Sequence, residues 1–244
     1  MTTLRKDLPD YLYWLTEKVE ALVKPAAFLR KAKGTVAPMG GTRAWGLPDV
    51  PYFDGWPTLS GSTHENSYPA CWGQSPYDGE SFKLQLNLED IPSAVRKPEW
   101  PEVGVVWVFI DLSGRWEATV KFDPRPAASI KWQPRLDSKI YRAPEAAELI
   151  VADTITCCSE QTLPEIVPVD DMAETYDEWA QENYACRTPS NIQIGGWVWP
   201  IQGDYDRRNA DFVCALERQH FGDNGAVYLH YNTAQGFYAL AETC

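Results

Sequence analysis

The sequence predicts an α+β fold, in which antiparallel sheets follow a helical N-terminal segment. Apolar residues recur at helical spacing near the N-terminus. From residue 34 onward, short runs alternate apolar and polar side chains between turns rich in Gly and Pro. Helices gathered in two regions, with strands in meanders elsewhere, are typical of the α+β class. With 44% hydrophobic residues, the chain of 244 residues is also too apolar to be disordered.

The first 33 residues are expected to form helices that pack on the rest of the chain. A first helix is predicted to begin near Asp7, which can cap it, and to continue to Leu22, because leucine and valine recur every three or four residues. Pro25 ends this helix and begins a second one, Pro25–Lys33, which Gly34 stops. Residues 34–244 then form the main domain.

Several later segments have the patterns of β-strands. Phe82–Leu88 alternates apolar and polar residues, which predicts a strand with one buried face. Val103–Ile110 is a nearly continuous apolar run that suits a central strand. Asp170–Tyr184 is predicted to be a helix with its acids on one face. The remaining predicted strands are Trp116–Phe122, Trp197–Ile201, Phe212–Arg218, Ala226–Tyr231 and Phe237–Leu240.

Two parts of the sequence repeat one order of motifs: a turn with Gly or Trp-Pro, an apolar strand, and a second strand that begins with Gly. The first set comprises Gly46-Leu47-Pro48, Phe82–Leu88 and Gly104–Phe109, and the second comprises Gly195–Pro200, Phe212–Leu216 and Gly225–His230. A divergent duplication, with halves at about residues 34–142 and 187–244, would explain this order. Chance similarity among strands that begin with Gly is the alternative.

The net charge of −12 comes almost entirely from residues 143–186, the segment that joins the two halves. This acidic segment contains eleven carboxylates and no Lys or Arg. Its field repels nucleic-acid phosphates and anionic lipid, so we expect neither nucleic acid nor a membrane as a partner, and it favours a basic protein. Alternatively, the folded chain places the acidic segment beside its own basic stretch, Lys121–Arg142.

The sequence lacks the usual signals for membrane insertion, secretion and cofactor binding. It has no run of 18 apolar residues, and acids interrupt the first thirty residues, which argues against a secretory signal. The six cysteines show no CxxC spacing, so reduced thiols in a cytoplasm are expected rather than a metal site. We therefore expect no cofactor and no metal.

No constellation of residues indicates catalysis. P-loop, GxGxxG and GxSxG motifs are absent. His64 lies in a polar loop, and His220 precedes Asp223 by three residues, but the nearest thiol, Cys214, is too far from His220 along a strand to touch it. Residues 204–215 resemble a calcium loop but lack its Gly and Glu. Enzymatic activity is therefore unsupported.

Taken in order, the Gly, Pro and Trp motifs resemble the YwqG-like family, a bacterial domain of mostly unknown function. Phe221 stands where that family usually has Trp. The resemblance implies an α+β fold with antiparallel sheets and a duplicated core, and it implies no catalytic residues. Some relatives are encoded beside antibacterial toxins, where small acidic proteins serve as immunity partners. The matching motifs are Gly40-Gly41, Gly46-Leu47-Pro48, Trp56-Pro57, Leu84–Leu88, Ile91-Pro92, Gly104–Phe109, Ile194-Gly195-Gly196, Pro200-Ile201-Gln202 and Phe221–Tyr228.

We therefore expect a cytoplasmic, non-catalytic binding protein, most specifically an immunity protein that occludes the active site of a cognate antibacterial toxin. The alternative is a small-ligand-binding protein or enzyme that uses a cleft between the two halves, with His64, His220 and Asp223 as candidate groups. For the first function, the predicted partner-binding residues are Asp170, Asp171, Glu174, Asp177, Glu178, Trp179 and Glu182.

Overall fold

The structure, a computed structural model, is essentially all-β in the part of the chain that it describes. Antiparallel sheets account for most of this part, and no helix in it reaches seven residues. The prediction of an α+β fold is therefore wrong, although the pairing of the strands is antiparallel. The described residues are 10, 24–36, 38–44, 48–52, 80–111, 117–133, 153–162, 179, 192–198, 211–217 and 225–243.

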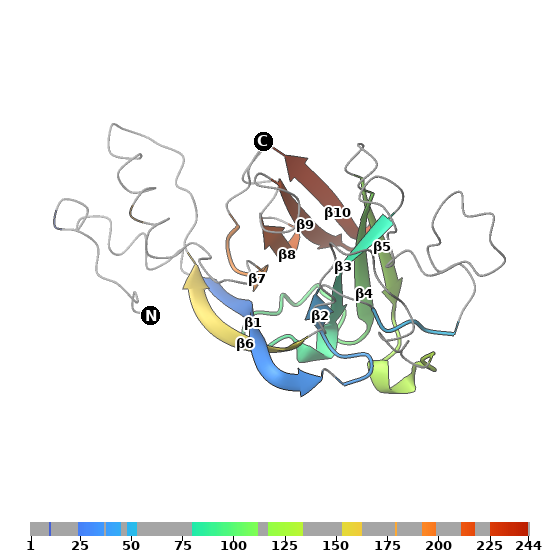
Figure 1. Ribbon diagram of the computed structural model, residues 1–244. Coiled ribbons are helices and arrows are strands. Elements are labelled where there is room, and N and C mark those ends of the chain that lie inside the picture. The colour runs from blue at the N-terminus through green and yellow to red at the C-terminus, as the bar shows by residue number, and fades with distance from the viewer. Residues whose placement is uncertain are drawn as a thin grey trace, which may run out of the picture.

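Two sheets pack against each other in this part of the chain (Figure 1). The smaller contains β2 (Arg43–Ala44), β3 (Glu80–Asn87), β4 (Val105–Asp111) and β5 (Ala118–Asp123), in the order β2-β3-β4-β5. The larger contains β1 (Lys24–Val36), β6 (Asp153–Thr162), β7 (Ile192–Gly195), β8 (Phe212–Glu217), β9 (Gly225–Asn232) and β10 (Gly236–Thr243), in the order β10-β9-β8-β7-β1-β6. Short 3₁₀ helices, η3 (Leu88–Asp90) and η4 (Ala127–Ser129), follow β3 and β5.

The predicted second helix, Pro25–Lys33, is instead part of the long strand β1. Its Ala, Leu and Lys residues have good helix propensity, but β1 pairs with β6 on one side and with β7 on the other. These pairings satisfy the backbone on both edges and bury Ala26 and Phe28, so tertiary structure overrides local preference. Of the predicted first helix only Asp10, in a 3₁₀ turn, is described.

Most of the predicted strands are confirmed, with two corrections. β3, β4, β5, β8, β9 and β10 lie where alternation or apolar runs predicted them. The strand predicted at Trp197–Ile201 is wrong in position, because β7 ends at Gly195 and the described residues Trp197 and Val198 lie beyond it. The polar residues of β3 are also buried, with Lys83, Gln85 and Asn87 only 7%, 0% and 8% exposed. Burial lowers the pKa of Lys83 to about 8.

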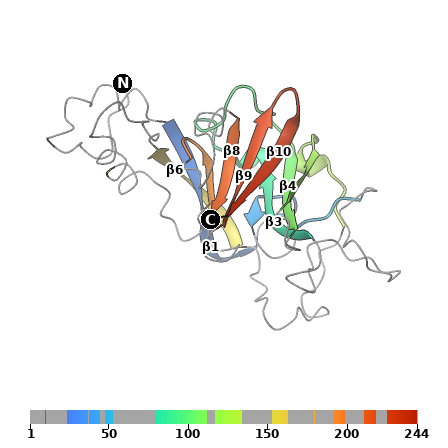
Figure 2. The same ribbon diagram turned by 90° about the horizontal axis from the view of Figure 1, so that it is seen from above.

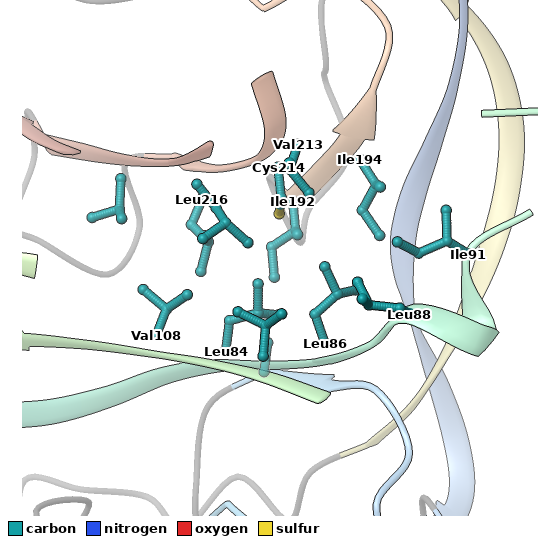
Figure 3. Close-up of a cluster of buried hydrophobic side chains, with 14 of the residues drawn as sticks. Leu84, Leu86, Leu88, Ile91, Val108, Ile192, Ile194, Val213, Cys214 and Leu216 are labelled. Carbon is teal, nitrogen blue, oxygen red and sulfur yellow. The ribbon is translucent and has the colours of Figure 1, made fainter. Parts of the chain in front are cut away.

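The main core lies between the two sheets. Leu84, Leu86 and Val108 point from the smaller sheet toward Ile194 and Leu216 of the larger one (Figure 3). Each sheet also buries apolar residues on its outer face, in smaller clusters centred on Trp107 in one sheet and on Tyr228 in the other. Because both faces of each sheet are covered, polar positions on these strands become buried as well.

The hairpins β3–β4 and β8–β9 have the same register and the same bulge. In the first, Phe82 pairs with Phe109 and Leu84 with Val108, so Lys83 is the extra residue of a β-bulge. In the second, the corresponding pairs are Phe212 with His230 and Cys214 with Leu229, and Val213 is the extra residue. A duplication would produce this correspondence, and the duplication itself stays a prediction.

The first described strand joins the sheet that contains the last strands of the chain. β1 precedes the meander β2–β5, yet it belongs to the larger sheet and pairs with β6 and β7. β6, which lies in the acidic segment, also contacts β2 of the smaller sheet. β1 and β6 pair antiparallel, from Lys24 opposite Thr162 to Ala32 opposite Thr154. The larger sheet therefore combines strands that precede and strands that follow the smaller sheet in the sequence.

The position of β1 predicts that the two fragments stay associated when the chain is cut between β5 and β6. A specific protease site inserted between residues 142 and 143 allows the folded protein to be nicked, with cleavage checked on a denaturing gel. We expect both fragments to elute together at the volume of the uncut protein in size-exclusion chromatography, because β1 remains hydrogen-bonded to β6 and β7. Separation of the fragments under native conditions would contradict the pairing of β1 with β6 and β7.

Candidate functional site

Most of the residues predicted to bind a partner or a small ligand lie outside the described part of the chain. This applies to His64, His220 and Asp223, and to the six acids Asp170, Asp171, Glu174, Asp177, Glu178 and Glu182. Trp179, predicted as a partner-binding residue, is helical and 9% exposed. Its indole therefore packs inside the protein and presents little surface to a partner.

The described part of the acidic segment includes one complete strand. β6 carries Asp153 and Glu160 and pairs along its length with β1. Among the described strands, β6 is the last of the larger sheet. The acidic segment is thereby attached to the fold at a sheet edge.

Polar and aromatic residues from separate segments converge at one end of the larger sheet. Because neighbouring strands are antiparallel, this end holds the start of β1, the end of β7, the start of β8, the end of β9 and the start of β10. The loop after η3 passes over the same end, as the green trace in Figure 2 shows. We call six residues here the sheet-end cluster: Lys24, Lys97, Trp197, Asp211, Asn232 and Tyr238. All six are half-buried.

Two sets of contacts order this cluster on the side of the larger sheet. The ammonium nitrogen of Lys24 lies 3.3 Å from the centroid of the Trp197 ring, a close cation–π contact. The Tyr238 hydroxyl and the Asn232 amide each donate a hydrogen bond of 3.0 Å to Asp211 Oδ2. Tyr238 also stacks on the buried ring of His230, with centroids 5.1 Å apart.

The loop that carries Lys97 is fixed by its neighbour, Arg96. The Arg96 guanidinium donates to the carbonyl of Glu102 at 2.8 Å and to that of Leu88 at 2.5 Å, so it joins the two ends of the loop. Val95 packs directly on Gly195, whose φ of +64° places it in the left-handed region. The loop after η3 is therefore held against the end of β7.

The charges of the cluster influence one another. Burial lowers the pKa of Lys24, and the positive charge of Lys97 lowers it further. Burial also lowers the pKa of Lys97, whereas the negative charges of Glu99 and Asp211 raise it. Two ammonium groups and two carboxylates thus lie within electrostatic range at the junction of the halves. Such a group of charges can bind ions or charged ligands, and it contains no pairing of a nucleophile with a base.

A second polar group, around Asp49, is entirely internal. Asp49 forms an ion pair of 3.0 Å with Arg43 and accepts a hydrogen bond of 2.7 Å from the Gly40 amide. The side-chain oxygen of Gln85, Oε1, accepts two hydrogen bonds. One comes from the backbone N–H of Asp49 at 2.8 Å, and the other from the indole N–H of Trp107 at 3.0 Å. These contacts hold residues 38–44 and 48–52 on the outer face of the smaller sheet, so we assign the group a structural role.

Comparison with known families identifies most of the chain as one domain. A family model described as a domain of unknown function, DUF1963, matches residues 42–233. The chain belongs to the DUF1963 family. The match includes Lys97, Trp197, Asp211 and Asn232, whereas Lys24 and Tyr238 lie outside it. No curated protein matches the chain by sequence. Membership of the DUF1963 family thus identifies the domain and leaves its function to be inferred.

Two further classes of site are missing from the described residues of this DUF1963 protein. Their His, Cys, Asp and Glu side chains form no group of three or more that could hold a metal ion. Their helices include none long and apolar enough to cross a membrane. Cys214, the thiol nearest to His220 in the sequence, is buried in the core between the sheets.

Sequence reasoning missed the sheet-end cluster. Its members are 214 positions apart at the extremes, and no spacing rule connects Lys24 with Tyr238. In the sequence, Asp211 belongs only to the incomplete calcium loop. The one usable signal was the motif Gly195-Gly196, since consecutive glycines indicate a tight turn or the close approach of another segment. Here that segment is the loop with Val95.

The packing of Val95 on Gly195 predicts a large effect of Gly195→Ala. The substitution places a Cβ in the left-handed region and against Val95 Cγ1, so it should lower the free energy of unfolding by roughly 2–5 kcal/mol. Gly236→Ala is a matched control, because Gly236 has a φ of +76° but no atom within 4 Å of the added Cβ. It should cost about 1–2 kcal/mol. Urea unfolding measures both, and equal losses would contradict the close approach.

The environment of Asp49 predicts a displaced titration. Burial raises its pKa to about 6, although hydrogen bonds from Gly40 and Gln85 oppose the rise. A raised pKa means that the folded state holds the proton more tightly than the unfolded state. The resulting stabilisation is complete below pH 3.8, the ordinary value for an aspartate side chain, and is lost as the pH rises through 6.

Carbon-13 NMR of the Asp49 carboxyl group should therefore show a midpoint near pH 6. The unfolding free energy of the wild type, relative to Asp49→Asn, should fall between pH 4 and pH 6 and then level off. The Asn variant does not titrate at this position and corrects for all other carboxyl groups. A midpoint near 4, with no pH dependence of the difference, would contradict the effect of burial.

Proposed function

We propose that this protein is a non-catalytic binding protein that recognises a basic partner through the acidic segment, residues 143–186. The observation that carries the proposal is the position of β6. This strand belongs to the acidic segment and is hydrogen-bonded to β1 from Asp153 to Thr162, so it attaches the segment to the edge of the larger sheet. A fixed field of one sign steers an oppositely charged partner during association.

The basic stretch Lys121–Arg142 is the competing partner within the chain. Two of its described residues are engaged with groups outside the acidic segment. Arg125 forms a bidentate interaction with Asp123, at 3.0 and 2.7 Å. Lys131 lies over the ring of Tyr52, 4.9 Å from its centroid. Because these two basic residues interact with groups outside the acidic segment, they favour the interpretation that the segment binds an external partner.

The resemblance to the YwqG-like family gives the proposal its specific form. Some members of that family are encoded beside antibacterial toxins, so we propose an immunity protein that acts in the cytoplasm and occludes the active site of a cognate toxin. Toxins that act on nucleic acid or nucleotides tend to be basic, and carboxylates placed over such a site occupy the position of phosphate. Trp179 is packed inside the protein, so the acids carry the proposed recognition.

Charge neutralisation within the acidic segment tests the proposal. The variant changes Asp171 and Asp177 to Asn, and Glu174 and Glu178 to Gln. Its affinity for the toxin domain encoded beside this gene should fall by about tenfold or more, mainly through slower association at low salt. Surface plasmon resonance at two salt concentrations measures the rate constants.

A second variant with the same change of net charge is the control. It changes four exposed acids outside the acidic segment, Asp10, Glu99, Glu102 and Glu117, to their amides. Its affinity should stay within about twofold of the wild type, because these acids lie outside the acidic segment that the proposal makes the interface. Equal losses in both variants, or nanomolar binding unchanged in both, would remove the acidic segment from the interface. Absence of a toxin gene beside this one would argue against an immunity function.

A further inference from the structure

We propose that β10 is a dimer interface, through which two copies of this chain join their larger sheets edge to edge. Among the strands that the structure describes, β10 is an outer strand of the larger sheet, next to β9 (Figure 1, Figure 2). It pairs with β9 over eight residues, Gly236–Thr243, without a bulge. Because an outer strand turns alternate N–H and C=O groups away from its sheet, β10 offers backbone donors and acceptors to a second strand.

The other three outer strands of the described sheets carry features that oppose such pairing, and β10 lacks them. β2 has only two residues, β5 contains Lys121, and β6 contains Asp153 and Glu160. Short length, charged side chains and proline are the features by which proteins protect sheet edges. β10 contains no Lys, Arg or Pro, and its one charged residue, Glu242, is buried near the end of the strand. β10 is therefore the least protected of these four edges.

Apolar side chains remain accessible on both faces of β10. On the inner face, Phe237, Ala239 and Ala241 pack against the main core but are only partly buried. Because side chains alternate along a strand, Leu240 lies on the outer face, where it is 36% exposed. Phe122 of β5 is also exposed, and its ring lies against that of Phe237, with centroids 4.8 Å apart. A strand added to β10 covers apolar surface on both faces at once.

The distribution of charge favours a second copy of this chain as the occupant. The net charge of −12 opposes the association of two copies, but residues 236–241 carry no charge. β6, which belongs to the acidic segment, is the opposite outer strand of the larger sheet. Five strand spacings of about 4.8 Å separate β6 from β10, roughly 24 Å in all or about three Debye lengths at physiological salt. Pairing through β10 therefore leaves the two β6 strands at the far edges of the joined sheet.

β10 is also complementary to itself when two copies run antiparallel. With Ala239 opposite the Ala239 of the second copy, Phe237 lies opposite Ala241, and Leu240 lies opposite Tyr238. The one acid of each strand then faces the first glycine of the other strand, so the two acids do not meet. Cross-strand pairs of apolar and aromatic residues stabilise sheets. A two-fold axis at Ala239 thus generates a closed dimer from one surface.

The mass of the full chain in solution tests the proposal. Sedimentation equilibrium between about 1 μM and about 100 μM, which covers dissociation constants in that range, should show twice the mass of one chain at the upper end. A reducing agent excludes dimers linked by a disulfide through Cys244. Leu240→Lys introduces a side chain that protects sheet edges, so the dissociation constant of the dimer should rise by about tenfold or more.

Met39→Lys is the matched control. Met39 is 40% exposed, has an aliphatic side chain like Leu240, and precedes β2 in the smaller sheet, so the same charge is added outside β10. Its dissociation constant should stay within about twofold of the wild type. Hydrogen exchange then locates the interface. In the wild type, the amides of residues 236–243 should exchange more slowly at the upper concentration than at the lower one, and in Leu240→Lys this difference should disappear.

Three results would overturn the proposal: a monomer at every concentration, equal weakening in the Leu240 and Met39 variants, or a dimer in which the exchange of residues 236–243 does not depend on concentration. A monomer would leave the edge of β10 to a strand of another protein. All these measurements use the chain alone and alter no acid of residues 143–186. Their outcome is therefore separate from that of the proposed partner binding.

Discussion

β1 is hydrogen-bonded along both edges, to β6 and to β7, and much of the remaining structure depends on this pairing. A strand from the first half of the chain thereby becomes an interior strand of the sheet built mostly by the second half. The same pairing places Lys24 beside Trp197 and attaches the acidic segment, through β6, to the sheet edge. The attachment of the acidic segment and the contact between Lys24 and Trp197 thus both depend on the pairing of one strand.

The two halves share a backbone plan and differ in the side chains on their outer faces. Trp107 in the first half and Tyr228 in the second occupy corresponding central positions. In the first half, Gln85 and Asp49 build an internal polar network beside Trp107. In the second half the position of Gln85 corresponds to Ala215, and polar groups gather instead at the sheet end, around Asp211. The polar side chains of the first half are therefore buried and stabilise the fold, whereas those around Asp211 in the second half are only half-buried.

Burial sets the direction of the pKa shift of Asp49 beside the smaller sheet and of Lys24 and Lys97 at the end of the larger sheet. Asp49 is buried, which raises the pKa of its carboxyl group, and its contacts with Gly40 and Arg43 hold this part of the chain together. Lys24 and Lys97 are only half-buried, and burial lowers the pKa of each ammonium group.

The sequence by itself determined the strands whose side chains alternate or form apolar runs, such as Phe82–Leu88 and Val103–Ile110, because burial on a pleated surface imposes those patterns locally. It also determined the charge of the acidic segment and the sites of the tight turns. Tertiary structure alone decided that Pro25–Lys33 is a strand, since its pairing partners lie more than a hundred residues away. It alone brought Lys24, Lys97, Trp197 and Asp211 together, because antiparallel topology gathers strand ends that no local spacing can connect.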